Sequence, residues 1–404
     1  LVRRLMDSFI WQPGYPLVSA KLDGNELVLS QCRFTFDNDP DATLWVLPVH
    51  VRNAGAETKV LLESDEIRVR IADPAGAVVV NAGGHGFFRV AYSANLLSRL
   101  TGEVLSGLDT IERYNLVDDA WNAVVSGNLS AVDFLSFTGN FVAERELAVW
   151  QSLAIGIRGV GRLLQRDQLP LLAARVRALT APALADLGTT ARAGEADLTA
   201  KLRGLLVGLV AVTGQDELMQ RRCRDILLHP DADGNDPELV AAATTVVASI
   251  GNVDDYEWVL ERFRNPDTPQ EQIRMLYALA EFDDAELMKR TCELAFSGEV
   301  KTQNAPFLLN RCVANRFHGE LAWQFVQQHW KEANEKFPVN TIVRMVDSAK
   351  MLNSDVAEAS VQSFFTEHDI PQAVQTLQQV LERQRVNVAV RRRESGSLTS
   401  HLTD

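Results

Sequence analysis

The sequence of 404 residues has few cysteines and no long apolar run. No stretch of about 18 uncharged apolar residues occurs, so no membrane span is expected. Lys and Arg number 40 against 53 Asp and Glu, and the net charge of -13 argues against nucleic-acid binding. The cysteines never form a C-x-x-C pair, so their spacing indicates neither a disulfide framework nor a structural zinc site. They are Cys32, Cys223, Cys292 and Cys312.

The common signatures of catalysis are missing as well. None of the seven histidines is followed by Glu, so the sequence lacks the H-E-x-x-H helix on which two histidines ligate one zinc ion. It also lacks the G-x-S-x-G elbow of a serine nucleophile and the G-x-x-x-x-G-K-[ST] phosphate loop. The sequence therefore predicts no catalytic residue, no metal ligand and no cofactor in this chain.

Two loops match ligand-binding motifs only in part. Asp231, Asp233 and Asn235 imitate the opening of a calcium loop, but Asp236 stands where that loop needs glycine. A cap by Asp236 on a following helix is the favoured interpretation. Residues 83–86, Gly-Gly-His-Gly, can cup an anion with backbone amides or form a turn with positive φ, and the turn is favoured.

Residues 12–90 carry the pattern of half-buried strands. Alternate residues from Trp45 to Val51 are apolar and share one face, as in a strand with one buried side. Asp23-Gly24 lies between two apolar runs and favours a tight hairpin turn. Because no connection is long enough for a helix, the pattern predicts an antiparallel β-sandwich.

After about Tyr92 the apolar period becomes that of helices. Val117, Trp121 and Val124 fall on one helical stripe, and many further helices follow, separated by proline-containing turns. About 300 residues of short helices without a clean repeat of fixed length predict stacked helical hairpins, an all-α superhelical (HEAT-like) domain. The Ser/Thr-rich tail, residues 395–404, is predicted to fray.

Several segments carry motifs of a known family. They are LMDSFIWQPGYP at 5–16, WVLPV at 45–49, NAGGHGFFRVAY at 81–92, RYNLVDDAW at 113–121, KTQ at 301–303, LAWQFVQQHW at 321–330 and LER-x-x-VNV at 381–388. In this order they resemble the region downstream of the catalytic domain in zinc aminopeptidases of the aminopeptidase N type, a gluzincin family. The resemblance extends from one end of the chain to the other.

The resemblance implies a division into three parts. Residues 1–11 are the terminal helix of a missing catalytic domain, residues 12–90 a β-sandwich and residues 91–404 an α-helical superhelical C-terminal domain. Zinc and the catalytic motifs belong to the missing domain. The implied partners are that catalytic domain and peptide substrates, whose access the helical domain restricts and gates. Because the chain starts with Leu1 and its first residues lack the pattern of a signal peptide, we expect an excised or processed piece, with any targeting signal upstream. The cysteines are compatible with a reducing compartment, and the expected location is the cytoplasm.

Three basic residues are candidates for binding the carboxylate of a peptide, because guanidinium and ammonium groups pair with carboxylates. They are Lys301, Arg311 and Arg316. The alternative is that all three are solvated helix residues. For Asp118 and Asp119, a scaffold role at the joint between sandwich and helices is favoured over acid/base chemistry. An alternative for the whole chain is a stand-alone α-solenoid scaffold that binds peptides or proteins.

Overall fold

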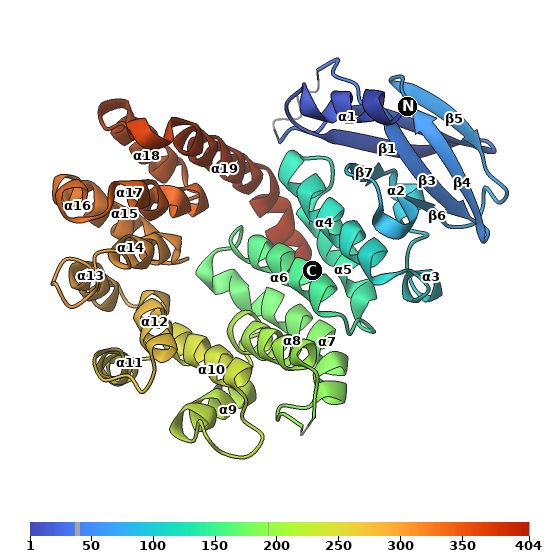
Figure 1. Cartoon of the computed structure of the whole chain (residues 1–404). Coiled ribbons are helices and arrows are strands. Elements are labelled where there is room, and N and C mark those ends of the chain that lie inside the picture. Colours follow the sequence, from blue (N-terminus) through green and yellow to red (C-terminus); the bar gives the residue numbers. More distant parts are fainter. Residues whose placement is uncertain (37–40, 193, 404) are drawn as a thin grey trace. The chain divides into compact units, whose positions relative to one another are not determined.

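The computed structural model describes residues 1–36, 41–192 and 194–403, and the chain forms two compact units, Leu1–Val160 and Gly161–Asp404 (Figure 1). The first unit contains all the strands of the described residues. These are β1 (Pro16–Asp23), β2 (Glu26–Arg33), β3 (Leu47–Asn53), β4 (Ala56–Leu62), β5 (Glu66–Arg70), β6 (Val78–Val80) and β7 (Arg89–Tyr92). Its helices are α1 (Val2–Ile10), η1 (Ala82–Gly84), α2 (Ala94–Leu97), α3 (Glu103–Ser106), α4 (Thr110–Ser126), α5 (Ala131–Thr138), η2 (Gly139–Phe141) and α6 (Leu147–Gly161), which ends at the start of the second unit.

The strands form two sheets that share one core. Their orders are β5-β2-β1-β7 and β4-β3-β6. Alternate residues from Trp45 to Val51 are buried in this core together with Leu27 and Leu29 of β2, as the strand pattern predicts. The β1–β2 hairpin turns at Gly24, whose φ of 58° lies in the left-handed region that glycine adopts without strain. The two sheets are therefore the layers of a sandwich.

One strand pair differs from the predicted antiparallel sandwich. β7 lies parallel to β1, with Leu17 opposite Arg89 and Ala20 opposite Tyr92. β7 reaches this edge only after the chain has passed through the other sheet, so no short turn forces it to run antiparallel. The order of strands first and helices afterwards is confirmed.

The change from strand to helix follows from local capping and apolar spacing. α4 begins with a capping box between Asp109 and Glu112 and ends at Gly127, whose φ is 83°. Val117 and Val124 on its inner face are fully buried. The predicted helical stripe is therefore the buried face of α4.

The second unit is helical throughout its described residues. Its elements are η3 (Arg166–Gln168), α7 (Leu169–Leu187), α8 (Asp197–Gly208), η4 (Leu209–Thr213), α9 (Glu217–Leu228), α10 (Pro237–Ile250), α11 (Val253–Arg264), α12 (Pro269–Ala278), η5 (Leu279–Glu281), α13 (Ala285–Leu294), α14 (Ala305–Ala314), α15 (Gly319–Gln328), α16 (Trp330–Lys336), α17 (Val339–Val346), η6 (Asp347–Met351), α18 (Asp355–Glu367), η7 (Pro371–Ala373) and α19 (Val374–Thr403). Short polar residues cap many of these helices, and Asp236 accepts the Leu239 N–H at the start of α10, as predicted.

Polar contacts between these helices recur at a nearly constant spacing along the sequence. They join residues 31 to 38 positions apart, from the α9–α11 pair to the contacts of α19. Examples are Arg224–Asp255, Tyr256–Thr291, Asn315–Ala280, Glu320–Ser354, Trp323–Ser360, Gln384–Leu352 and Arg391–Asn353. These contacts therefore join helices at a similar distance along the chain, although the sequence shows no repeat of fixed length.

The prediction of a frayed tail is wrong for residues 395–403. They continue α19, and Leu398 and Leu402 bury the same face of that helix. Their hydroxyl groups bond carbonyls one turn back, as Thr399 does to Ser395 O at 2.8 Å. The prediction was based on the Ser/Thr-rich composition alone. It overlooked the spacing of Leu398 and Leu402, which gives the segment an apolar face that packs against the fold. Asp404 lies outside the described residues.

Candidate functional site

Lys301 precedes α14, and Arg311 lies within that helix. Lys301 is exposed in the turn before the helix, where its carbonyl accepts the N–H groups of Asn304 and Ala305. Arg311 is in the last turn, and its guanidinium carbon lies 4.4 Å from the centre of the Tyr277 ring on α12. The pair is 34 residues apart, so this cation–π contact has the same sequence spacing as the polar contacts between helices.

Aromatic and cationic groups gather around this contact on α12 and α14. Phe307, one turn before Arg311, is 39% exposed. On α12, Arg274 precedes Tyr277 by three residues and so shares its face. The Nε of Arg274 is buried without a hydrogen-bond partner. We call Arg274, Tyr277, Phe307 and Arg311 the α12–α14 face.

Arg316 has a different environment. Its Nη2 donates to the carbonyls of Gly161 and Leu164, the second at 3.2 Å, at the end of α6. Burial, together with the charges of Arg162 and Arg166, lowers the pKa of Arg316 to about 10. Arg311 therefore stacks on Tyr277, whereas Arg316 bonds carbonyls near the end of α6, so the two candidates have different partners.

A cluster next to Arg316 was not predicted from the sequence. Arg166 donates two hydrogen bonds to the carboxylate of Asp283, one of them 2.7 Å long. Its guanidinium carbon lies 3.8 Å from the centre of the Phe317 ring. His318 Nε2 lies 3.1 Å from Asp283 Oδ1. Because Arg166 and Asp283 are 117 residues apart, no local sequence signal connects them. The carboxylate links the segment before α7 to the segments before α13 and α15.

Asp118 and Asp119 hold the sandwich to α4. Arg89 Nη1 donates to Asp118 Oδ2 at 2.6 Å and to Asp119 Oδ1 at 3.1 Å. The Val90 N–H donates to Asp119 Oδ2 at 3.0 Å. Burial raises the pKa of Asp119 to about 7 despite the opposing charge of Arg89. Every described contact of the two carboxylates is structural, in line with the favoured scaffold role.

The glycine loop at residues 83–86 binds a carboxylate of the chain itself. The Gly83 N–H donates to Glu112 Oε1 at 2.8 Å, and Arg52 donates to Glu112 Oε2 at 2.6 Å. Although burial favours its protonated form, these hydrogen bonds lower the pKa of Glu112. Gly83 and Gly84 have φ angles of 74° and 66°, so the predicted turn is confirmed.

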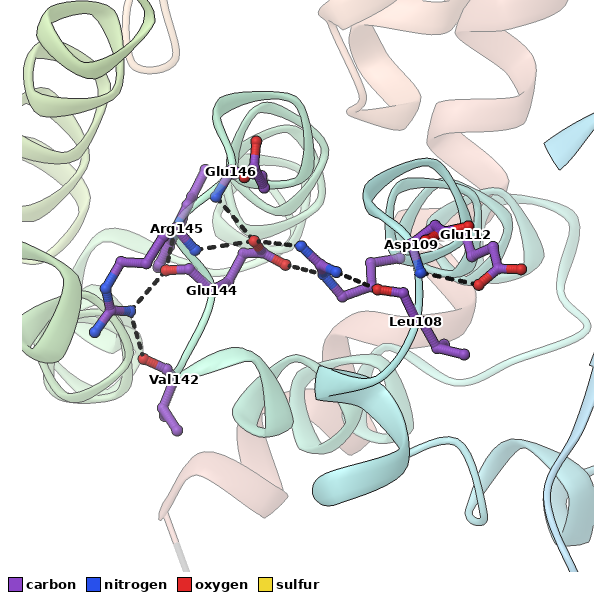
Figure 2. A network of polar contacts seen from close by, with 9 residues as sticks. Leu108, Asp109, Glu112, Val142, Glu144, Arg145 and Glu146 are labelled. Carbon is purple, nitrogen blue, oxygen red and sulfur yellow. Dashed lines mark hydrogen bonds and ion pairs between the residues drawn. The ribbon is translucent and has the colours of Figure 1, made fainter. Parts of the chain in front are cut away.

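A second buried ion pair fixes the start of α6 (Figure 2). Glu144 accepts hydrogen bonds from Arg113 Nε at 2.6 Å and from the N–H groups of Arg145 and Glu146 at 2.9 and 2.8 Å. A hollow of about 170 Å³ adjoins this pair and is also lined by Phe141. Because the Glu144 carboxylate is fully used by these donors, the hollow offers a ligand no free anionic group from this residue.

Metal chemistry has no site among the described residues. Zinc in proteins needs three or four nitrogen, sulfur or oxygen ligands around one point. In residues 1–36, 41–192 and 194–403, no three His, Cys, Asp or Glu side chains gather to hold a metal ion. None of these described residues is therefore assigned to zinc. Over the same ranges, no helix has the length and apolar character needed to cross a bilayer.

Comparison with known proteins identifies the family. A sequence model of the ERAP1-like C-terminal domain matches residues 77–386, well over half of the chain. The chain belongs to the ERAP1-like C-terminal domain family. The match extends from the end of the sandwich to the middle of α19, and it confirms the resemblance to the C-terminal region of aminopeptidases of the aminopeptidase N type.

Relatives of this ERAP1-like chain are aminopeptidases. Aminopeptidase M1 of Arabidopsis thaliana is 28% identical over 419 residues, which cover 96% of this chain and 47% of that protein. Glutamyl aminopeptidase of Rattus norvegicus is 23% identical. The alignment covers 96% of this chain and 43% of that protein. Puromycin-sensitive aminopeptidase of Caenorhabditis elegans is 25% identical, with 83% of this chain covering 37% of that protein. The chain spans less than half the length of these curated relatives.

Proposed function

We propose that this chain is the C-terminal, substrate-shaping part of a zinc-dependent aminopeptidase that removes N-terminal residues from peptides. The observation that carries the proposal is the alignment of 96% of the chain to less than half of an aminopeptidase. Hydrolysis and zinc binding are then functions of a catalytic domain elsewhere in the protein. The role of this chain is to restrict access to that site and to exclude water when the enzyme closes.

The proposed gate is a superhelix of helical hairpins. The recurrence of contacts at 31 to 38 residues supports it, because solenoids are held together by equivalent contacts between neighbouring repeats. Such arrays present extended surfaces to a ligand. A surface of this kind suits peptides of several residues better than single amino acids.

Peptide binding is proposed for the α12–α14 face together with the three predicted cations Lys301, Arg311 and Arg316. The exposed ring of Phe307 offers apolar contact. Arg311 carries a charge that attracts a carboxylate and stands over an aromatic ring. Arg316 donates to backbone carbonyls instead, so among the three cations Arg311 has the surroundings that best fit a peptide ligand.

The proposed partner is the catalytic domain of the same protein. Exposed apolar side chains on the first unit support this proposal. Trp11 is 79% exposed and Phe87 is 71% exposed, and no residue of α1 is buried. Val2, Met6 and Ile10 of α1 are also exposed, at a spacing of four residues, and contiguous exposed apolar patches are typical of surfaces that a partner covers. We propose that α1 and Phe87 face the catalytic domain.

The second candidate function is a stand-alone scaffold that binds peptides or proteins. The regular contacts between hairpins favour it as well, since many helical arrays act only by binding. The sequence of the rest of the protein separates the two candidates. An H-E-x-x-H segment favours the enzyme, and a protein without one favours the scaffold.

The decisive experiment compares the full-length protein with this chain alone. Zinc is measured by mass spectrometry and activity by hydrolysis of aminoacyl-anilide substrates. We expect stoichiometric zinc and hydrolysis in the full-length protein and neither in the chain. Zinc-dependent hydrolysis by the chain alone would contradict the proposal, and a full-length protein without both would favour the scaffold.

A further inference from the structure

The carbonyl end of α6 is bonded by side chains from distant parts of the second unit. The last carbonyls of a helix have no partner within the helix. The carbonyls of Gly161, the last residue of α6, and of residues 162–164, which follow it, all accept hydrogen bonds from later segments. The bonds come from Arg316 to Gly161 and Leu164, from Asn353 to Arg162 at 3.1 Å, and from Ser395 to Leu163 at 2.9 Å.

Neighbouring bonds support this arrangement. Arg162 Nη2 donates to the carbonyl of Ala314, the last residue of α14. Arg391 of α19 donates to Asn353 Oδ1 at 3.0 Å and so orients the amide that bonds Arg162 O. Ser395 shares its hydroxyl proton between Leu163 O and Arg391 O of its own helix.

The charges match the two helix ends. The guanidinium of Arg316 stands at the end of α6 and that of Arg162 at the end of α14. Helix C-termini carry partial negative charge, so each cation is stabilised by the backbone it bonds. Such stabilisation explains how the two arginines lie close together although their charges repel each other.

These bonds differ in sequence range from the contacts between successive hairpins. Hairpin contacts join residues 31 to 38 apart, whereas the bonds to residues 161–164 span 152, 155, 191 and 232 positions. A solenoid held only by neighbour contacts changes its curvature by small adjustments at every step. Hydrogen bonds that join the beginning of the unit to its middle and its end prevent such changes in curvature.

We propose that Arg316, Asn353 and Ser395 form a latch on the carbonyls of residues 161–164 that fixes the curvature of the helical unit. Within the second unit, α19 returns to α7 (Figure 1), where His401 Nε2 lies 3.1 Å from Arg175 Nη2, further along α19 than Ser395. The latch itself does not depend on the proposed peptidase function. Its consequence for peptide access does rest on that function.

The test uses Asn353→Ala in the full chain. This variant removes the bond to Arg162 O and the acceptor of Arg391. Asn387→Ala is the matched control, because Asn387 Nδ2 donates to Lys350 O at 2.7 Å, a contact between neighbouring elements only. Hydrogen exchange followed by mass spectrometry reports opening of each segment. We expect exchange about fivefold to tenfold faster for residues 161–168 and 391–403 in Asn353→Ala, and unchanged exchange there in the control.

Two outcomes overturn the latch. Unchanged exchange of both segments in Asn353→Ala, or an equal increase in the control, shows that the bonds do not hold the array. The double variant Asn353→Ala/Ser395→Ala, with a larger expected increase in the same segments, provides a second measurement. In the full-length enzyme, a change in peptide hydrolysis without a change in anilide hydrolysis tests the gating function separately.

Discussion

Arg203 donates hydrogen bonds from both Nη atoms to the carboxylate of Glu195, and no part of the Arg203 side chain is exposed. Its Nη1 also lies 3.4 Å from Oδ2 of Asp236, the residue that caps α10. One buried cation therefore joins α8, the loop before it and the start of α10. The two carboxylates are 12% and 15% exposed and depend on this charge.

Arg203→Ala is expected to lower the free energy of unfolding by about 3–5 kcal/mol, because it removes the fully buried cation that both partly buried carboxylates contact. Urea unfolding followed by circular dichroism measures the loss. Arg221→Ala is the control, since its pair with Glu217 is exposed and is expected to contribute less than about 1 kcal/mol. Similar losses of unfolding free energy in both variants would show that the buried ion pair contributes no more to stability than the exposed one.

Asp119 makes stability depend on pH. Its pKa of about 7 lies above the value of 3.8 for an unburied aspartate. Between these two values the folded chain keeps a proton that the unfolded chain has lost. The contribution of this group to stability is therefore full below about pH 4, falls as the pH rises to about 7, and is constant above that.

Asp119→Asn tests this dependence, because an amide oxygen can still accept the Val90 N–H but does not titrate. The free energy of unfolding of the unchanged chain, minus that of the variant, is expected to fall by up to about 4 kcal/mol between pH 4 and 7. Arg89 keeps its 2.6 Å bond to Asp118 in both proteins. Chemical denaturation at several pH values measures the difference, and a flat difference contradicts the assignment.

Local features of the fold could be predicted from the sequence, but the contacts between Arg89 and the two aspartates of α4 could not. The buried face from Trp45 to Val51 and the cap by Asp236 follow from spacing within a few residues, and both are confirmed. The Asp118–Asp119 pair was noticed, but its partner Arg89 lies about 30 residues away on a strand. Side-chain partners at such distances depend on how elements pack, which no local pattern specifies.

The same limit applies to the candidate peptide site. Arg311 stacks on Tyr277, 34 residues earlier on another helix, and the sequence shows no repeat that would reveal this contact. Arg316 was chosen for its charge alone. Its bonds to the end of α6 span 152 and 155 residues and became visible only in the folded unit.

Glycines in α6 permit close helix packing. A Cβ atom at Gly159 would lie 2.1 Å from Cζ2 of Trp121, nearer than any real contact. Gly159→Ala is therefore expected to lower the free energy of unfolding by about 1–3 kcal/mol through overpacking. Gly208→Ala is the control, because nothing lies within 4 Å of its Cβ position and its φ of -61° is helical. Thermal unfolding should show a small gain there, of about 0.5–1 kcal/mol.

Arg311→Ala in the full-length enzyme tests the proposed peptide site. If Arg311 binds a peptide carboxylate, its loss should raise KM for peptides about tenfold, since a charge-assisted hydrogen bond contributes about 1.5–3 kcal/mol. Aminoacyl-anilides carry no such carboxylate, so their KM should stay the same. Arg290→Ala removes a similar stacked arginine, 4.8 Å from the centre of the Tyr256 ring, outside the α12–α14 face. Equal effects on both substrates, or on both variants, would mean that the arginine supports the fold instead of the ligand.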